Sequence, residues 1–340
     1  MPGSDIGIDL GTATVLINVK GKGIVLQEPS VVAVDKSTKK VVATGTDAQK
    51  MIGRTPAEIV AIRTMRGGVI SNFDLTDEML RYFIKHVYNY HVFKPRIMIC
   101  VPSRITEVEE RAVYDAAIQA GARKVYLIEE PIAAAIGAGL DITQPVGNMI
   151  VDIGGGTTDV AVISLKDTAA STSIKVAGDL YNETITKFIR RKYKILIGER
   201  TAEDIKIAIG GVLPREESQT MPVRGRSLIS GLPEMIETNS DELLEIMDTP
   251  TKSILEAVRS VLEHTPPELV GDIITNGIVL TGGGSLLHGM DKRIETATGI
   301  STRIADDPIT CVARGTVLAL ENLDTLQSGL IHVSSFREGK

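Results

Sequence analysis

The stretch "NMIVDIGGGTTDVAVISL", residues 148–165, decides the fold of this chain. An apolar run ends in Asp152, a turn of three glycines and two threonines follows, and a second apolar run begins. This pattern predicts two strands joined by a turn. A hairpin needs a turn of only two residues. The longer, glycine-rich turn beside a carboxylate therefore indicates that a ligand sits on it.

The same plan occurs near the N-terminus in "DIGIDLGTATVLINV", residues 5–19. Patterns of strands followed by helices surround both hairpins, which predicts an α/β protein. Two matched hairpins predict two similar domains that face each other across a cleft, with one turn on each wall. Residues 212–239 are rich in proline, glycine and charge. They are expected to form irregular strands and loops in a smaller insert.

Composition limits the class of protein. The 340 residues are 43% apolar and carry a formal net charge of −6, which is typical of a globular protein and argues against binding to duplex nucleic acid. The two cysteines, Cys100 and Cys311, stand among apolar residues and are expected to be buried, reduced thiols. No apolar run approaches about 18 residues, so we expect neither a secretion signal nor a membrane span.

The two turns predict a phosphate site. Glycine lets consecutive backbone N–H groups converge on a ligand, and such nests bind anions. The two halves of this clamp are expected to be Gly11, Thr12, Ala13 and Thr14, and Gly154, Gly155, Gly156 and Thr157. An aspartate beside phosphate requires a cation between them, and Mg²⁺ joins carboxylates to phosphate oxygens through its waters. Asp9 and Asp152 are therefore expected to face a hydrated Mg²⁺.

Two further features predict contacts to the rest of a nucleotide. A third glycine turn, "GGGS" at residues 282–285, follows a strand and precedes a helix, where ligands often bind. Glu203 and Lys206 lie one turn apart on a helix and can hydrogen-bond a ribose or a base. Each feature alone also fits a structural turn or a solvated helix face. The two matched hairpins together with the third turn are much more specific.

These residues resemble the actin-like ATPase superfamily. Within it, the chain is similar to the bacterial actin MreB family from residue 5 to about residue 322, in segments that include "GIDLGTA", "KGIVLQEPSVVAVD", "LIEEPIAAAIGAGL", "IGERTAEDIKIAIG" and "GIVLTGGGSLLHGMD". The resemblance implies two pseudo-symmetric α/β domains, each carrying a smaller subdomain, with a nucleotide in the cleft between them. The implied subdomains are IA (1–29, 70–140 and 321–340), IB (30–69), IIA (141–178 and 255–320) and IIB (179–254).

The resemblance also assigns roles to residues. It implies ATP and Mg²⁺ as cofactors, with Glu203 and Lys206 at the nucleoside. It places the adenine beside Gly283, Gly284, Ser285 and Leu286. Glu130 is the implied residue that orients the attacking water, with Thr157 as its helper and Asp152 beside them. Without the resemblance, Glu129 and Glu130 fit a simple negative charge at a helix N-terminus.

The function implied by the resemblance is that of a slow ATPase which assembles into double protofilaments. Such filaments lie in the cytoplasm on the inner face of the cell membrane and organise cell shape. Val92 and Phe93 match an apolar pair that enters the bilayer, although Phe93 also fits a residue packed under its own loop. Other cytoskeletal paralogues and cell-shape membrane proteins are implied partners, and nucleic acid is not.

Four alternatives are considered from the sequence. The first is a soluble small-molecule kinase of the same superfold, although no clear aspartate base for it is found. The second is a chaperone-type ATPase, which would need a peptide-binding domain beyond the ATPase core. The third is a pseudo-ATPase that binds nucleotide as a structural ligand, against which the retained Glu130 and Thr157 argue. The fourth is a shape or motility paralogue in a wall-less cell. One departure favours a divergent paralogue: the family's first turn reads Gly-Thr-Ala-Asn-Thr, whereas this chain has Thr14 and Val15 at the last two positions.

Overall fold

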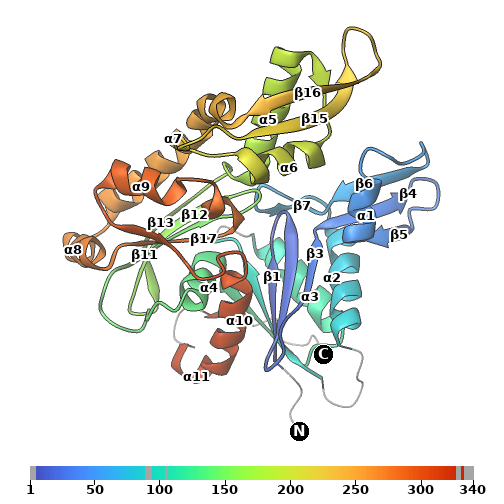
Figure 1. The fold of residues 1–340 in the computed structure, drawn as a ribbon. Coiled ribbons are helices and arrows are strands. Elements are labelled where there is room, and N and C mark those ends of the chain that lie inside the picture. Colours follow the sequence, from blue (N-terminus) through green and yellow to red (C-terminus); the bar gives the residue numbers. More distant parts are fainter. Residues whose placement is uncertain (1–4, 89–93, 104–105, 327–330, 333–340) are drawn as a thin grey trace.

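The computed structural model describes residues 5–88, 94–103, 106–326 and 331–332 of the chain. The described residues form two α/β halves, each with a large mixed sheet and a smaller sheet beside it (Figure 1). None of the helices within these ranges has the length and apolar character needed to cross a membrane.

The first large sheet has the strand order β19-β10-β9-β1-β2-β3. Its strands are β1 (Asp5–Leu10), β2 (Thr14–Val19), β3 (Gly23–Pro29), β9 (Arg96–Val101), β10 (Lys124–Glu129) and β19 (Ile331–His332). The second large sheet has the order β13-β12-β11-β17-β18. Its strands are β11 (Asn148–Ile153), β12 (Thr158–Ser164), β13 (Asp167–Ile174), β17 (Ile278–Thr281) and β18 (Thr302–Ile304).

The two large sheets share one topology. In each, an antiparallel hairpin is extended by a third antiparallel strand on one side and by two parallel strands on the other. The first strand of each hairpin, β1 or β11, lies at the centre and is buried almost throughout. The prediction of two similar α/β domains built on the two hairpins is confirmed.

Two small three-stranded sheets accompany the large ones. The first half carries β4 (Val31–Asp35), β5 (Val41–Thr44) and β6 (Ile59–Arg63), followed by the short hairpin of β7 (Met65–Arg66) and β8 (Val69–Ile70). The second half carries β14 (Ile195–Leu196), β15 (Thr220–Ser227) and β16 (Pro233–Asn239).

Residues 212–239 contain strands of a small sheet, as predicted, but the prediction that these strands are irregular was wrong. β15 and β16 form a regular antiparallel ladder with seven paired positions from Thr220↔Asn239 to Arg226↔Pro233. The prolines of this segment argued against a regular hairpin, because proline has no N–H to donate to a neighbouring strand. In the structure they occupy positions where no further strand requires that N–H. Pro222 lies outside the two-residue pairing with β14, and Pro233 is the first residue of its strand.

Helices pack on the large and the small sheets (Figure 1). They are α1 (Thr46–Met51), α2 (Phe73–Val87), α3 (Glu107–Gln119), α4 (Glu130–Gly137), α5 (Gly178–Tyr193), α6 (Glu199–Ile209), α7 (Ser240–His264), α8 (Pro267–Asn276), α9 (Met290–Thr298), α10 (Cys311–Glu321) and α11 (Leu323–Leu326), with a 3₁₀ turn η1 (Gly283–Leu286).

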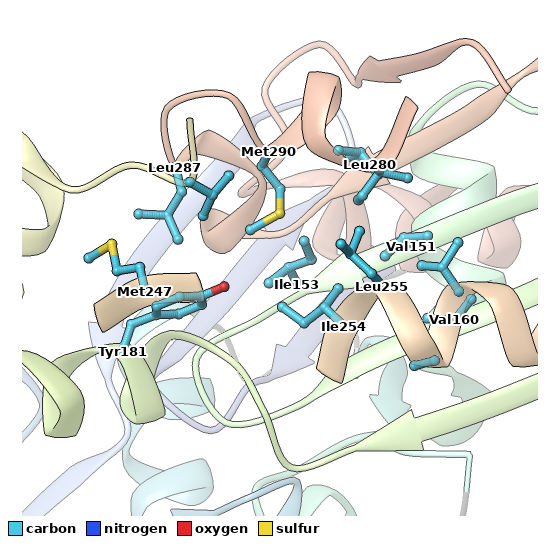
Figure 2. Close-up of a cluster of buried hydrophobic side chains, with 14 of the residues drawn as sticks. Val151, Ile153, Val160, Tyr181, Met247, Ile254, Leu255, Leu280, Leu287 and Met290 are labelled. Carbon is cyan, nitrogen blue, oxygen red and sulfur yellow. The ribbon is translucent and has the colours of Figure 1, made fainter. Parts of the chain in front are cut away.

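The second half has a large apolar core between its sheet and its helices. Tyr181 of α5 is fully buried, and its hydroxyl lies 2.9 Å from the hydroxyl of Thr251 in α7. Figure 2 shows apolar side chains from strands, helices and the loop after η1 meeting in this core: Val151, Ile153, Val160, Met247, Ile254, Leu255, Leu280, Leu287 and Met290. This core fixes the strand β11 that ends at the second glycine turn.

Two helices join the halves. α4 follows the first sheet in the chain and packs against β11 and β12 of the second, whereas α10 follows the second sheet and packs against β1, β2 and β9 of the first. They cross at two glycines with their backbones in contact. A Cβ atom on Gly315 would lie 1.8 Å from the carbonyl oxygen of Ala133, and one on Gly137 would lie 1.8 Å from that of Cys311.

Candidate functional site

A cavity of about 640 Å³ lies between the two halves. Both predicted turns line it, and so do residues of α6 and of the third glycine turn. The predicted residues that line it are Asp9, Gly11, Thr12, Ala13, Thr14, Glu130, Asp152, Gly154, Gly155, Gly156, Thr157, Glu203, Lys206, Gly283, Gly284 and Leu286. The fold therefore brings together residues that lie as much as 277 positions apart in the sequence (Asp9 to Leu286).

The remaining predicted site residues are Ser285, Val92 and Phe93. Ser285 is fully buried, and its hydroxyl donates to the carbonyl oxygen of Gly282 at 2.7 Å, so it closes its own turn and does not face the cavity. Val92 and Phe93, the predicted membrane pair, lie outside the described residues. Of the two positions that depart from the family pattern, Thr14 faces the cavity and Val15 is buried in the core.

The first turn is held from behind by Ser30. The hydroxyl of Ser30 donates to the carbonyl oxygen of Gly11 at 2.6 Å, and its backbone N–H donates to that of Ala13 at 3.0 Å. With these carbonyl groups engaged on the outer side, the turn is oriented to present N–H groups toward the cavity, as an anion site requires.

The second turn is held by the N-terminus of α5. The backbone N–H groups of Gly178 and Asp179 donate to the carbonyl oxygens of Gly154 and Gly155 at 3.2 and 2.7 Å. The two turns touch across the cleft: a Cβ on Gly155 would lie 2.5 Å from the Cβ of Ala13. Glycine is thus required at the place where the two halves of the clamp meet.

The β7–β8 hairpin covers this end of the cleft, which the sequence did not predict. Its turn residue Gly68, at φ +75°, donates its N–H to the Thr12 hydroxyl at 3.0 Å. A Cβ on Gly68 would lie 2.7 Å from the methyl group of Thr157. One glycine therefore contacts a threonine of each predicted phosphate turn.

An ion pair closes the cleft further out. Arg63, at the end of β6, pairs with Glu199, the first residue of α6, and so joins the small sheet of one half to the other half. The Arg63 side chain is 14% exposed and that of Glu199 is 43% exposed, so the pair is shielded from water on the arginine side only.

Buried carboxylates gather beside the turns. Burial raises the pKa of Asp9 from 3.8 to about 7, opposed by a hydrogen bond from Cys100 and assisted by the charge of Asp152. Burial likewise raises the pKa of Asp152 to about 6, opposed by a hydrogen bond from Thr281. The pKa of Glu130 is raised well above its ordinary value by burial and by the charges of Asp159, Asp152 and Asp9.

This set of donors fits a hydrated divalent cation. Asp9 and Asp152 end the central strands of the two sheets and line the same cavity. Their raised pKa values reflect negative groups held close together in a buried place, which a cation would stabilise in the ionised form. No group of three or more histidine, cysteine, aspartate or glutamate side chains in the described ranges is arranged to ligate a metal directly. Contact through water from the two aspartates is the arrangement the site offers.

The far end of the cavity fits a nucleoside. Lys206 of α6 is largely buried, which lowers its pKa, and its amino group lies 3.3 Å from the carbonyl oxygen of Gly178 and 3.7 Å from Glu203. Ile207 and Leu286 line the cavity although 72% and 53% of their surfaces are exposed. Two such apolar side chains at a cavity wall favour a flat, partly apolar ligand such as a base.

Several residues that line the cavity were not predicted from the sequence. Besides Gly68 and Ile207, these include Met65 next to the β7–β8 turn, Arg215 after α6, and Ile309 before α10. Arg215 donates to the carbonyl oxygen of Gly210 at 3.0 Å. The glycines of "MRGG" were the available signal for the covering hairpin, but only the three-dimensional contact to Thr12 shows what that turn does.

The raised pKa of Asp9 predicts a pH effect on the stability of the ligand-free protein. The folded state binds the Asp9 proton more tightly than the unfolded chain, so this contribution to stability is full below pH 3.8 and is lost as pH rises through about 7. Wild type should therefore lose more stability than Asp9→Asn between about pH 5 and pH 8. Urea unfolding in EDTA at both pH values measures this difference. Parallel losses in the two proteins would show that Asp9 does not titrate in this range.

The sequence matches the family described as MreB/Mbl protein over residues 3–328. It is 54% identical to the cell shape-determining protein Mbl of Bacillus cereus over 323 residues, which cover 95% of this chain and 97% of that protein. It is 51% identical to the cell shape-determining protein MreB of Escherichia coli over 327 residues, which cover 94% of each chain.

Solved structures agree with these matches. The fold is similar to MreB5 of Spiroplasma citri bound to ADP, with a TM-score of 0.91, 37% identity, and coverage of 96% of this chain and 99% of that one. It is also similar to the chain of a MamK double helical filament, with a TM-score of 0.76 and coverage of 94% and 98%. At 19% identity, the second similarity concerns the fold alone.

Proposed function

Because this chain belongs to the MreB/Mbl family and has the actin-like fold, we propose that it is a filament-forming ATPase of the cell-shape cytoskeleton. One observation carries the proposal: matched Gly/Thr turns from both halves meet in one cavity, with Asp9 and Asp152 beside them. A nucleotide bound there would contact both halves at once and favour their closed arrangement. The solved MreB5 relative was bound to ADP or to AMPPNP, which supports a nucleotide as the ligand.

Different residues of the cavity would bind different parts of the nucleotide. The N–H groups of residues 11–14 and 154–157 would bind the phosphates, and Glu203 and Lys206 would bind the ribose. The base would lie between Ile207 and Leu286, beside Gly283 and Gly284. Mg²⁺, when bound through water to Asp9 and Asp152, would neutralise phosphate charge.

Glu130 is the proposed residue that orients the attacking water. It begins α4. Burial, together with the charges of Asp159, Asp152 and Asp9, keeps its pKa high in the ligand-free protein. A positive charge among these carboxylates lowers the pKa of Glu130, so that its ionised carboxylate accepts a hydrogen bond from water. Thr157, at the end of the second turn, is the proposed helper. These residues would promote hydrolysis by positioning the water, without forming a covalent intermediate, and this fits a slow ATPase.

We propose the four-subdomain division of the family for this chain: IA at 1–29, 70–140 and 321–340, IB at 30–69, IIA at 141–178 and 255–320, and IIB at 179–254. Supporting it, the first small sheet lies within residues 30–69, and the second lies within residues 179–254. Closure of the cleft would then be a movement of IB toward IIB, with the Arg63–Glu199 ion pair between them.

The proposed cellular role is assembly into double protofilaments in the cytoplasm, on the inner face of the membrane. Val92 and Phe93 are the proposed lipid contacts. A pair of side chains buries too little area for stable attachment, because about 25 cal/mol per Å² yields only a few kcal/mol. A polymer would multiply this weak contact. Cytoskeletal paralogues and cell-shape membrane proteins are proposed as further partners.

Electron microscopy of the purified protein with Mg-ATP, with and without anionic liposomes, tests this role. We expect paired filaments that lie on the lipid surface. Phe93→Ser should keep the filaments in solution but lose them from the liposomes. Phe73→Ser, which removes a side chain that is 43% exposed at the start of α2, is the matched control and should keep both. Single particles under every nucleotide would contradict a self-assembling filament and favour a soluble kinase.

A further inference from the structure

The two carboxylates of the proposed cation site are each held by the neighbouring parallel strand, at the same position in both halves. In the first sheet, Asp9 of β1 is paired in register with Cys100 of β9, and the Cys100 thiol donates to Asp9 Oδ1 at 3.3 Å. In the second sheet, Asp152 of β11 is paired in register with Thr281 of β17. The Thr281 hydroxyl donates to Asp152 Oδ1 at 2.7 Å.

The burial of these groups makes the two contacts specific. All four residues are at most 8% exposed, and an uncompensated polar group in such a place is costly. Both donors stand at the ends of otherwise apolar strands, "IMICV" and "IVLT". Thr281 is completely buried, so its hydroxyl has the Asp152 carboxylate as its partner and not bulk water.

The backbone that follows Thr281 lies close to the Asp152 carboxylate. Gly282 follows at φ +77°, and a Cβ at this position would lie 2.9 Å from Asp152 Oδ1 and 2.3 Å from the carbonyl oxygen of Ile153. Glycine therefore allows the strand end to approach Asp152 closely. The neighbouring strand thus fixes Oδ1, and in the ligand-free protein the Asp152 carboxylate also shares a side-chain hydrogen bond with Glu130 on the cavity side.

We infer that Thr281 and Cys100 are positioning residues for the proposed Mg²⁺ site: each fixes one oxygen of its aspartate so that the other faces a water of the cation. This inference rests on the proposed function, because it requires Asp9 and Asp152 to be the cation-facing groups. Partners that orient metal-binding carboxylates commonly change metal affinity 10- to 100-fold when removed.

The two donors differ in strength, which gives the inference a graded test. A hydroxyl donates a strong, short hydrogen bond to a carboxylate, whereas a thiol is a weak donor. Loss of the Thr281 hydroxyl should therefore disturb the cation site more than loss of the Cys100 thiol. Replacing the thiol by a hydroxyl should make the two halves more alike.

The experiment measures the affinity of a fluorescent, non-hydrolysable ATP analogue over a range of Mg²⁺ concentrations and in EDTA. Thr281→Val keeps the side-chain shape but removes the donor, and it should raise the Mg²⁺ concentration at half effect by about tenfold or more. Affinity in EDTA should stay at the wild-type value. Thr281→Ser, which keeps the donor, should restore the Mg²⁺ dependence.

Variants of Cys100 form the second part of this experiment. Cys100→Ala should shift the Mg²⁺ midpoint in the same direction as Thr281→Val but by less. Cys100→Ser, which replaces the thiol by a slightly smaller but stronger donor, should bring the midpoint to the wild-type concentration or below it. Because it introduces little change in shape, Cys100→Ser remains informative if a larger change prevents folding.

The outcomes separate this inference from the proposed function. If wild type binds the nucleotide equally with and without Mg²⁺, the cation site itself is overturned. If wild type depends on Mg²⁺ but Thr281→Val has the same midpoint, the positioning role is overturned. An equal loss of affinity in EDTA and in Mg²⁺ would also overturn it, because a merely structural role would weaken both.

Discussion

Glu130→Gln is expected to lower the rate of ATP hydrolysis by about 10² to 10⁴-fold, while nucleotide affinity stays at or above the wild-type value. The amide has almost the shape of the carboxylate but cannot accept a proton from water. The variant also removes a carboxyl group whose ionisation is opposed by burial and by the charges of Asp159, Asp152 and Asp9. Binding of a phosphate-bearing ligand should therefore not suffer.

The adjacent residue offers a matched control. Glu129 is the N-cap residue of α4, and it lines a different pocket on the other side of the polypeptide, beside Asp159 and Ser173. Glu129→Gln should hydrolyse ATP at nearly the wild-type rate. Phosphate release in single-turnover reactions, together with nucleotide titration, measures both variants. Loss of nucleotide binding by Glu130→Gln, or equal slowing by both variants, would contradict the assigned role.

Gly315→Ala is expected to destabilise the protein by about 3 kcal/mol or more, or to prevent its folding. The added methyl group would lie 1.8 Å from the carbonyl oxygen of Ala133 and 2.7 Å from its carbonyl carbon. These atoms belong to the backbone of α4, so no change of rotamer relieves the overlap. The two helices must separate, and the apolar core that both sheets share around them must open.

Gly271→Ala is the control because it makes the same change at a helix position where the added methyl group meets no neighbour. Gly271 lies in α8, is exposed, and has no atom within 4 Å of its added Cβ. Alanine favours a helix over glycine by about 1 kcal/mol, so this variant should be as stable as wild type or more so. Urea unfolding of both variants gives the comparison. Similar free energies of unfolding would show that the crossing tolerates a wider separation.

The sequence predicted the fold because local patterns carry it. Each hairpin is recognisable in the sequence by an apolar run, an aspartate and a Gly/Thr turn. The repetition of this pattern predicts that the two halves are alike. The proposed ligand-binding groups of the turns are backbone N–H groups, so their positions follow from the hairpins. This is why the residues around Asp9 and Asp152 meet in the cavity as expected.

Contacts between strands that are far apart in the chain could not be predicted from the sequence. That Thr281 donates to Asp152 follows from the register of β17 on β11, and no local pattern fixes that register. The position of Gly68 over Thr12 likewise depends on how the small sheet packs. Ser285 shows the opposite error, because a hydroxyl in a glycine turn can face a ligand or its own backbone, and here it donates to Gly282.

Glu130 shows where residue type alone was insufficient. A glutamate at the first turn of a helix is usually a favourable terminal charge, and Glu129 and Glu130 fit that description equally well in the sequence. The structure separates them: Glu130 lines the cavity between the two halves, and Glu129 does not.

The exchange of helices between the halves also bears on how the chain acquires its structure during synthesis. α10 covers β1, β2 and β9, yet it leaves the ribosome some two hundred residues after the last of those strands (Val101 to Cys311). The first sheet therefore emerges with an apolar face of which α4 covers only the part over β9 and β10. Folding of the earliest segment must wait for one of the latest, and in the interval the cell has to keep the uncovered face from aggregating.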